Sequence, residues 1–349
     1  MIRKLLNIVV VIIFVWSCSD EPVATVFFNL KTENGVFISC EGNFMYGNSS
    51  LSFYNPENKT VQNQLFYARN NAPLGDVAQS LALHENAIFI VVNNSGKIYA
   101  IDTETAEFKG VITGLISPRY MHFISDEKAY VSDLYSHKIS IVNPKTFETS
   151  GEIDLAENHT SEQMVQVGKY VFVSSWSFDE YILVIDSETD QLIDSIKTPY
   201  QPRHLKIDKN NKIWVLSDGG FEGSPVGKEP AALTRIEPET RTVEQIFRFE
   251  NEINQTSNLE MNNTKDTLYF VKGGVCKMAV NSTHLTDSAF ISTENKLLYK
   301  MAINPKNNEI YVADAIDYTQ DAIVFRYSQQ GALIDSFKVG INPSDFLFR

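Results

Sequence analysis

Short apolar strands with an aromatic residue at the centre recur along this chain at a nearly constant interval. Seven of them can be aligned on that residue, which is Phe37, Phe89, Tyr130, Phe172, Trp214, Tyr269 and Tyr311. Subtracting consecutive positions gives steps of 52, 41, 42, 42, 55 and 42 residues. A period near 42 with two longer steps indicates a repeat protein that carries two insertions.

A second pattern follows each of several repeats about ten residues later. It is a strand that runs into a turn of acidic or amide, small and Thr residues, as in IDTET (101–105), VNPKT (142–146), VIDSET (184–189) and IEPET (236–240). Asp and Asn side chains accept hydrogen bonds from backbone N–H groups two residues further on, and Pro presets its own φ angle. The pattern therefore predicts a tight hairpin in each repeat.

One complete repeat, residues 120–155, contains four short strand patterns: YMHFISD, KAYVSDL, KISIVNP and ETSGEIDL. Helical repeats of similar length would need apolar residues at spacings of three and four, whereas these segments are rich in β-branched residues. A helical or solenoid repeat is the alternative. Four antiparallel strands in about 40 residues favour an all-β, seven-bladed β-propeller with four-stranded antiparallel blades.

The last residues, INPSDFLFR, match the first strand of a repeat, and the first aromatic strand has no such partner before it. We therefore predict that residues 343–348 form the innermost strand of the first blade and close the ring. The propeller is expected to span residues 34–349. The preceding residues form a linker that can add an edge strand at FFNL (27–30).

The N-terminus has the pattern of an export signal. Arg3 and Lys4 precede an apolar run from Leu5 to Trp16, which is short for a transmembrane helix and typical of a secretory signal peptide. An uncleaved membrane anchor is the alternative. VWSC (15–18) resembles the lipobox of bacterial lipoproteins, so residues 1–17 are expected to be removed, Cys18 to be lipidated, and residues 18–33 to form the lipidated linker.

Ser19-Asp20-Glu21 directly follows that cysteine and resembles the signal that exports lipoproteins of the Bacteroides group to the cell surface. The resemblance implies a protein that is held on the outer membrane by its lipid and faces outward. A soluble domain is stably tethered when several acyl chains insert into the bilayer.

Charge and cysteine content exclude several classes of protein. The formal net charge is −13, and a nucleic-acid binder needs a surplus of Lys and Arg, so no nucleic-acid partner is expected. No CxxC or HxxxH spacing occurs, so no metal site is predicted. Cys40 and Cys276 lie far apart in the repeat pattern and are interpreted as small core residues.

Both insertions, CEGNFMYGNSS (40–50) and DGGFEGSPVGKEPA (218–231), fall between the second and third strands of a blade and enlarge one end of the propeller. Binding residues concentrate on loops that a rigid scaffold holds. The residues predicted to face a ligand at this end are Asn43, Phe44, Tyr46, Asn93, Tyr135, Trp176, Phe178, Phe221 and Tyr318. Aromatic planes with amides among them suit a large, flat, partly polar ligand. The alternative is that individual aromatic side chains only cover the blades.

Arg119 and Arg203 occupy equivalent positions, where the chain enters the innermost strand of a blade. Two guanidinium groups at the channel could bind a phosphate or carboxylate, or each could pair with an acidic residue of a neighbouring blade.

Asp133, Asp218 and Asp314 recur at equivalent strand ends. Turn formation by their side chains explains this recurrence better than a Ca²⁺ site does.

No motif for catalysis accompanies the histidines His122, His159 and His204. The chain has no GxSxG, no paired HxxE motifs and no carboxylate pair of predictable separation. We therefore expect a binding protein rather than an enzyme, with no cofactor.

The VIDSET turn and the repeat resemble those of YVTN/YncE-like β-propellers over about residues 35–349. Together with the N-terminal signal, the whole chain resembles the BtuG-type surface lipoproteins of Bacteroides relatives. That resemblance implies binding of cobalamin or another corrinoid, and its transfer to a BtuB-like TonB-dependent transporter in the outer membrane. Two alternatives stay open. One is a surface scaffold or a glycan- or protein-binding propeller. The other is a lyase similar to streptogramin-degrading propellers. Such a lyase would need a His and a metal-binding Glu around the channel, and the scarcity of Glu at the strand ends argues against it.

Overall fold

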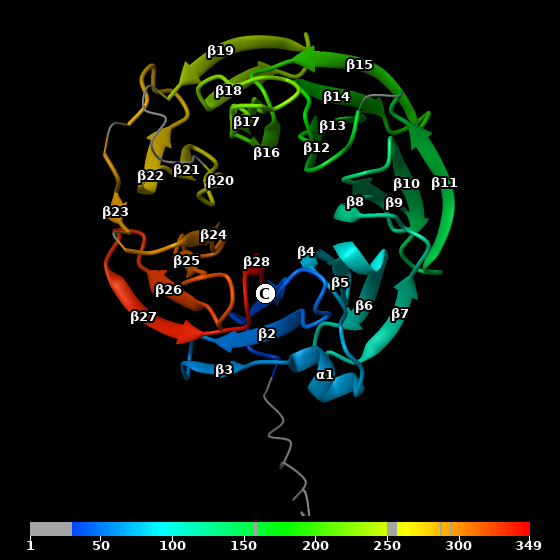
Figure 1. Ribbon diagram of the computed structural model, residues 1–349, viewed down its shortest axis with the longest axis vertical. Helices are drawn as coiled ribbons and strands as arrows, with labels where there is room; N and C mark the ends of the chain where they lie inside the picture. The colour runs from blue at the N-terminus through cyan, green and yellow to red at the C-terminus, as the bar shows by residue number, and fades with distance from the viewer. Residues whose placement is uncertain (1–29, 157–158, 250–256, 287, 294) are drawn as a thin grey trace, which may run out of the picture.

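The computed structural model describes residues 30–156, 159–249, 257–286, 288–293 and 295–349. Seven sheets, each of four antiparallel strands, stand side by side in a ring (Figure 1). Residues of the innermost strands line a central channel. The predicted seven-bladed β-propeller is thus confirmed. The propeller strands lie between residues 36 and 348, so a chain that starts at Ser19 contains all seven blades.

Counted from the channel outward, blade 1 consists of β28 (Pro343–Phe348), β1 (Val36–Cys40), β2 (Ser50–Asn55) and β3 (Thr60–Gln62). Blade 2 consists of β4 (Ala78–His84), β5 (Ala87–Val92), β6 (Lys97–Asp102) and β7 (Phe108–Ile112). Blade 3 consists of β8 (Pro118–Ser125), β9 (Lys128–Asp133), β10 (Lys138–Asn143) and β11 (Glu148–Asp154).

Blade 4 consists of β12 (Met164–Val167), β13 (Tyr170–Ser175), β14 (Tyr181–Asp186) and β15 (Gln191–Lys197). Blade 5 consists of β16 (Pro202–Ile207), β17 (Ile213–Ser217), β18 (Ala232–Glu237) and β19 (Thr242–Arg248). Blade 6 consists of β20 (Ser257–Met261), β21 (Thr267–Val271), β22 (Gly274–Ala279) and β23 (Ile291–Ser292). Blade 7 consists of β24 (Leu298–Ile303), β25 (Ile310–Asp314), β26 (Ile323–Tyr327) and β27 (Leu333–Lys338).

The ring closes as predicted, through the last strand. β28 pairs antiparallel with β1, with Ile38 opposite Phe346, so strands more than 300 residues apart share one sheet (Figure 1). The hydroxyl groups of Ser39 and Ser344 add a buried hydrogen bond of 2.8 Å. Pairing the two ends removes the open edge that the first blade would otherwise expose.

The hydrophobic core is divided into seven clusters, and each fills the space between two adjacent blades. The seven aligned aromatic residues are all buried in the second strands. Trp214, for example, stacks on Phe247 in the cluster between blades 5 and 6, and its indole N–H donates to Asp208 Oδ2 at 2.9 Å. The aromatic residue repeats along the sequence because one such side chain packs into the space between each pair of adjacent blades.

The predicted turns form through the predicted side-chain contacts. Asp102 Oδ1 accepts from the backbone N–H of Glu104 at 2.9 Å, and Asp186 Oδ1 accepts from that of Glu188 at 2.9 Å. Both hairpins connect the third and fourth strands of their blades. The recurring acid is therefore a local turn former.

The link from blade 1 to blade 2 contains a helix that the sequence reading missed. α1 (Leu65–Asn70) buries Leu65 and Phe66 against the first blades, and the 3₁₀ helix η1 (Asn93–Ser95) follows β5. The 52-residue step therefore combines the loop at 41–49 with α1. Cys40 and Cys276 are buried, as expected of core residues, and neither forms a disulfide within the described ranges. The signal peptide, Cys18 and FFN of the FFNL segment lie outside the described residues.

Candidate functional site at the channel mouth

Because neighbouring strands in every blade are antiparallel, the loops between second and third strands lie at the same end of the channel, which we call the mouth. Six aromatic side chains on these loops, here called the rim aromatics, are between 47% and 79% exposed: Phe44, Tyr46, Tyr135, Phe178, Phe221 and Tyr318. They come from blades 1, 3, 4, 5 and 7. All six were predicted to face the ligand end, and the structure leaves each open to solvent.

Some of the predicted site residues lie together. Phe178 and Phe221 meet edge to face with 6.2 Å between ring centroids, which joins blades 4 and 5. The side-chain amide of Asn43 donates to the backbone carbonyl of Tyr318 at 2.8 Å, which joins blades 1 and 7. The 218–231 insertion therefore places its aromatic residue beside that of the neighbouring blade.

Trp176 links the rim to the channel. The Arg203 guanidinium carbon lies 4.6 Å from the centroid of its ring, and the indole N–H donates to Asp218 Oδ2 at 2.8 Å. Burial raises the pKa of Asp218, although the Trp176 hydrogen bond opposes the change. Because Asp218 also accepts from the N–H of Gly220, this carboxyl group both forms the predicted turn and orients Trp176.

Arg119 is buried and has its own partners. Its Nε and one terminal nitrogen each lie 2.7 Å from an oxygen of Glu162 on blade 4, and its other terminal nitrogen donates to Gln79 Oε1 at 2.5 Å. Arg119 is only 6% exposed and Glu162 1%. Of the two interpretations of Arg119, this geometry matches the pairing with an acidic residue of the neighbouring blade.

Arg203 is placed differently although its sequence position is equivalent. Its side chain is 36% exposed, and the nearest carboxylate, Glu162, lies 4.0 Å from Nε with both oxygens already bonded to Arg119. Within the described part of the chain, the Nε atom of Arg203 is buried and has no hydrogen-bond partner. Because the Arg203 guanidinium is partly exposed and the oxygens of Glu162 are bonded to Arg119, Arg203 can bind an anionic group that enters the mouth.

Two glutamates at the mouth contradict the expectation that Glu is scarce at the strand ends. Glu162 precedes β12, and Glu41 follows β1 and accepts a hydrogen bond of 2.5 Å from the hydroxyl of Tyr299. Burial raises the pKa of Glu41, and the Tyr299 hydrogen bond and the positive charge of Arg119 counteract it. Burial and then the charge of Glu41 raise the pKa of Tyr299. Both glutamates are visible in the sequence only as residues next to a strand.

Other predicted residues serve the scaffold. The Asn93 side chain is buried and donates to Ser117 Oγ and the Pro118 carbonyl, so its amide nitrogen is occupied. Asp133 accepts from the backbone N–H of Tyr135 and of Ser136, and Asp314 from that of Ile316. These contacts confirm that the recurring Asp residues form turns.

The three histidines do not form a common centre. His122 contacts Gln166 at 3.0 Å, and His159 contacts Asp179 at 2.6 Å. Burial, followed by the charge of Arg203, lowers the pKa of His204 well below its ordinary value, so that side chain is neutral. None of these contacts pairs a histidine with a nucleophilic side chain.

The channel opens into a cavity of about 680 Å³ at the end away from the mouth. Its wall includes Met121 and Met164 on one side, and the ion pairs Lys206–Glu260 (2.6 Å) and Lys300–Asp345 (3.5 Å) on the other. The sequence reading did not single out these residues. Because each pair joins neighbouring innermost strands, the charges in the wall compensate one another.

The fold and this site define a seven-bladed β-propeller with an aromatic mouth and an accessible arginine beneath it. The chain belongs to the family described as a domain of unknown function, DUF5074, which it matches over residues 34–348. Membership of the YncE-like or BtuG-type groups is not confirmed by this match. No curated protein sequence matches the chain.

Solved structures with similar folds have varied descriptions. A quinonprotein alcohol dehydrogenase-like protein from Bacteroides thetaiotaomicron has a TM-score of 0.69 at 14% identity, covering 92% of this chain and 79% of its own. The periplasmic gluconolactonase PpgL of Pseudomonas aeruginosa has a TM-score of 0.68 at 13% identity, covering 90% and 98%. Hydrazine synthase of Kuenenia stuttgartiensis has a TM-score of 0.57 at 16% identity, covering 76% and 87%. At such identities the likeness establishes the fold alone.

Within the part of the chain that the structure describes, no helix has the length and apolar character needed to cross a bilayer.

Proposed function

We propose that the protein is a binding protein that captures a large organic ligand at the mouth of its channel. The observation that carries this proposal is the placement of six exposed aromatic side chains around one end, above the Trp176–Arg203 pair. Exposed aromatic groups are unfavourable in water, and their concentration at one end of a rigid scaffold is typical of a binding surface.

The chemistry of these residues favours one type of ligand. Aromatic rings stack on a flat, partly apolar body, and Arg203 supplies a cation for a phosphate or carboxylate. Cobalamin is large, flat and rich in amides and carries one phosphate. We infer that cobalamin or a related corrinoid is the ligand, an inference that rests on this match and on the N-terminal resemblance.

The location follows from the N-terminal sequence. The VWSC segment and the following Ser19-Asp20-Glu21 support a lipid anchor on Cys18 and a position on the outer surface of the outer membrane. A protein held there would pass its ligand to a BtuB-like TonB-dependent transporter. The anchor would keep the captured ligand close to that transporter.

Two other functions use the same scaffold. A surface scaffold or a glycan- or protein-binding propeller would also expose aromatic residues at the rim. A lyase would need free acid and base groups, whereas Glu162 is bonded to Arg119 and Glu41 to Tyr299. The binding classes are therefore favoured over the lyase.

Titration of the chain from Ser19 to Arg349 with cyanocobalamin tests the proposal. We expect saturable binding at micromolar concentration or tighter, followed by absorbance or calorimetry. Phe221→Ala should weaken binding about 10-fold or more, since truncation of an aromatic residue that anchors a ligand costs about 2 kcal/mol or more. Phe108→Ala, an exposed aromatic residue on the outermost strand β7, should leave it unchanged. Absence of micromolar binding would eliminate corrinoids and leave the glycan- or protein-binding alternative.

A further inference from the structure

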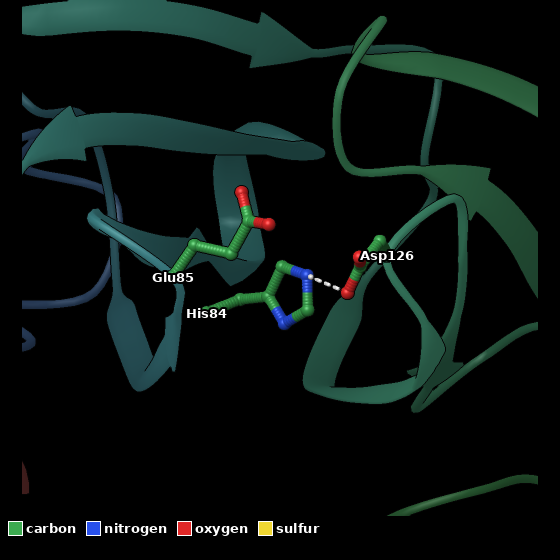
Figure 2. Close-up of side chains that lie close together, drawn as sticks. All are labelled: His84, Glu85 and Asp126. Atoms are coloured by element: carbon green, nitrogen blue, oxygen red, sulfur yellow. Dashed lines mark ion pairs between the residues drawn. The ribbon is translucent and has the colours of Figure 1, made fainter.

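Three potential metal ligands meet at the end of the propeller opposite the mouth. His84 ends β4, Glu85 follows it in the turn to β5, and Asp126 lies in the turn between β8 and β9. One ligand atom from each lies within 4.8 Å of the other two. In Figure 2, one edge of the His84 imidazole faces Asp126. The Glu85 side chain extends beside the same ring. The set therefore joins blade 2 to blade 3.

The contact between His84 and Asp126 has the length of a metal-bridged pair. The Nε2 atom of His84 lies 3.4 Å from Asp126 Oδ1 and, although buried, has no hydrogen-bond partner among the residues that the structure describes (Figure 2). An ordinary N–H···O bond would be about 2.7–3.2 Å long. Two ligands of a tetrahedral zinc ion, with bonds of about 2.0–2.1 Å, stand about 3.3–3.4 Å apart. The observed spacing fits the edge of such a tetrahedron.

The surroundings hold the imidazole and leave the carboxylates adaptable. The His84 ring stacks on Phe123 with 4.4 Å between centroids and 15° between planes, which limits its rotation. Glu85 and Asp126 are exposed and can shift by the small distance that a common ion requires. Lys145 lies 4.0 Å from Asp126 and 3.6 Å from Glu127, so an ammonium group competes for the same carboxylate.

We propose that His84, Glu85 and Asp126 bind a zinc ion. This ion would link the β4–β5 turn of blade 2 to the β8–β9 turn of blade 3, at the end opposite the mouth. An imidazole nitrogen favours Zn²⁺ over Ca²⁺ or Mg²⁺, which prefer oxygen ligands alone. Three protein ligands leave one tetrahedral position for water. The three residues come from two different blades, so no spacing motif marks them. This site is independent of the function of the mouth.

The test is the zinc stoichiometry of the chain from Ser19 to Arg349, measured by calorimetry with ZnCl₂ in a buffer that does not chelate. His84→Ala and Asp126→Asn should each remove one equivalent of bound zinc, or weaken its binding at least 10-fold. His284→Ala changes an exposed histidine elsewhere and should remove none of this binding. Bound zinc should also raise the unfolding temperature of the unsubstituted chain but not of His84→Ala.

Lys145→Ala separates metal binding from damage to the fold. Removal of the competing ammonium group should strengthen zinc binding severalfold, a gain that misfolding does not produce. The proposal is overturned if the unsubstituted chain takes up no zinc at 100-fold molar excess, or if His84→Ala retains every equivalent. It is equally overturned if the site takes Ca²⁺ or Mg²⁺ in preference to Zn²⁺.

Discussion

The guanidinium group of Arg203 lies over the ring of Trp176, 4.6 Å from its centroid, while the equivalent Arg119 is buried against Glu162. Two arginines in the same repeat position therefore have different environments. The difference arises because Glu162 has two carboxylate oxygens and Arg119 occupies both. Arg203 is left as the cation that a ligand in the mouth can reach.

Replacement of the two arginines should separate stability from binding. Arg119→Ala leaves Glu162 buried without its partner, and breaking a buried ion pair in this way costs about 3–5 kcal/mol. Arg203→Ala should change the free energy of unfolding by about 1 kcal/mol or less, because its side chain is partly exposed. Urea unfolding of both variants measures the contrast, and equal losses of stability would contradict it.

A double substitution provides the control. Arg119→Met combined with Glu162→Gln removes both charges and should recover part of the stability lost in Arg119→Ala, since the uncompensated carboxylate is gone. Arg203→Ala should instead weaken binding of a phosphate-bearing ligand such as cyanocobalamin about 10-fold or more. Unchanged affinity in Arg203→Ala would show that this guanidinium does not contact the ligand.

Trp176→Ala should weaken ligand binding at the mouth with a limited effect on the fold. The indole supplies a stacking surface and fixes Arg203, and its loss also leaves Asp218 without one hydrogen bond, which costs about 1–3 kcal/mol. We expect at least a 10-fold loss of affinity in the cyanocobalamin titration. Trp176→Phe keeps a stacking ring and should retain more of the affinity; equal losses in both variants would assign the effect to the Asp218 hydrogen bond.

The closing strand should contribute more than an ordinary tail. Phe346 is buried in the cluster between blades 7 and 1, so Phe346→Ala should lower the free energy of unfolding by about 3–5 kcal/mol. Removal of residues 343–349 deletes β28 and exposes the edge of β1, and we expect loss of cooperative unfolding. Thermal unfolding followed by circular dichroism checks both. Phe108→Ala, on an exposed outer strand, should stay within about 0.5 kcal/mol of the unsubstituted chain.

Glu41 should make stability depend on pH. Its pKa is raised by burial, so the folded protein retains its proton at a pH where the unfolded chain has lost it. The free energy of unfolding therefore falls as pH rises. The contribution of Glu41 to stability is fully present below its ordinary pKa of 4.5 and is lost as pH rises through the raised pKa. Glu41→Gln should be more stable than the unsubstituted chain at pH 7 and show no such advantage at pH 4. The same advantage at both pH values would assign the effect to packing.

Sequence reasoning recovered the blades because each is a local unit. Four strands joined by short hairpins bring their own turn residues, such as Asp186, and their own central aromatic residue, such as Phe172. The helix α1 was not predicted, because a six-residue helix in a connecting segment is too short to show a recognisable periodicity. At the mouth, the exposed rim aromatics could be assigned to one end from loop position alone.

The partners of the charged residues could not be deduced in this way. Arg119 meets Glu162 across 43 residues, Glu41 meets Tyr299 across 258, and His84 faces Asp126 from another blade. Each pair forms only when neighbouring blades are docked, and the side-chain geometry then decides which group is occupied and which is free. Equivalent positions such as Arg119 and Arg203 are therefore indistinguishable in the sequence although they differ in the folded protein.

The sequence by itself determined the number of blades, the strands and turns within them, and the end of the channel that carries aromatic loops. These features depend on residues close together in the chain, through strand alternation and local hydrogen bonds. Only the tertiary structure decided that Arg203 is accessible, that Arg119 is occupied, and that His84 and Asp126 lie 3.4 Å apart. Such contacts depend on the packing of blade against blade, because burial and charge compensation are set by neighbours that are distant in the sequence.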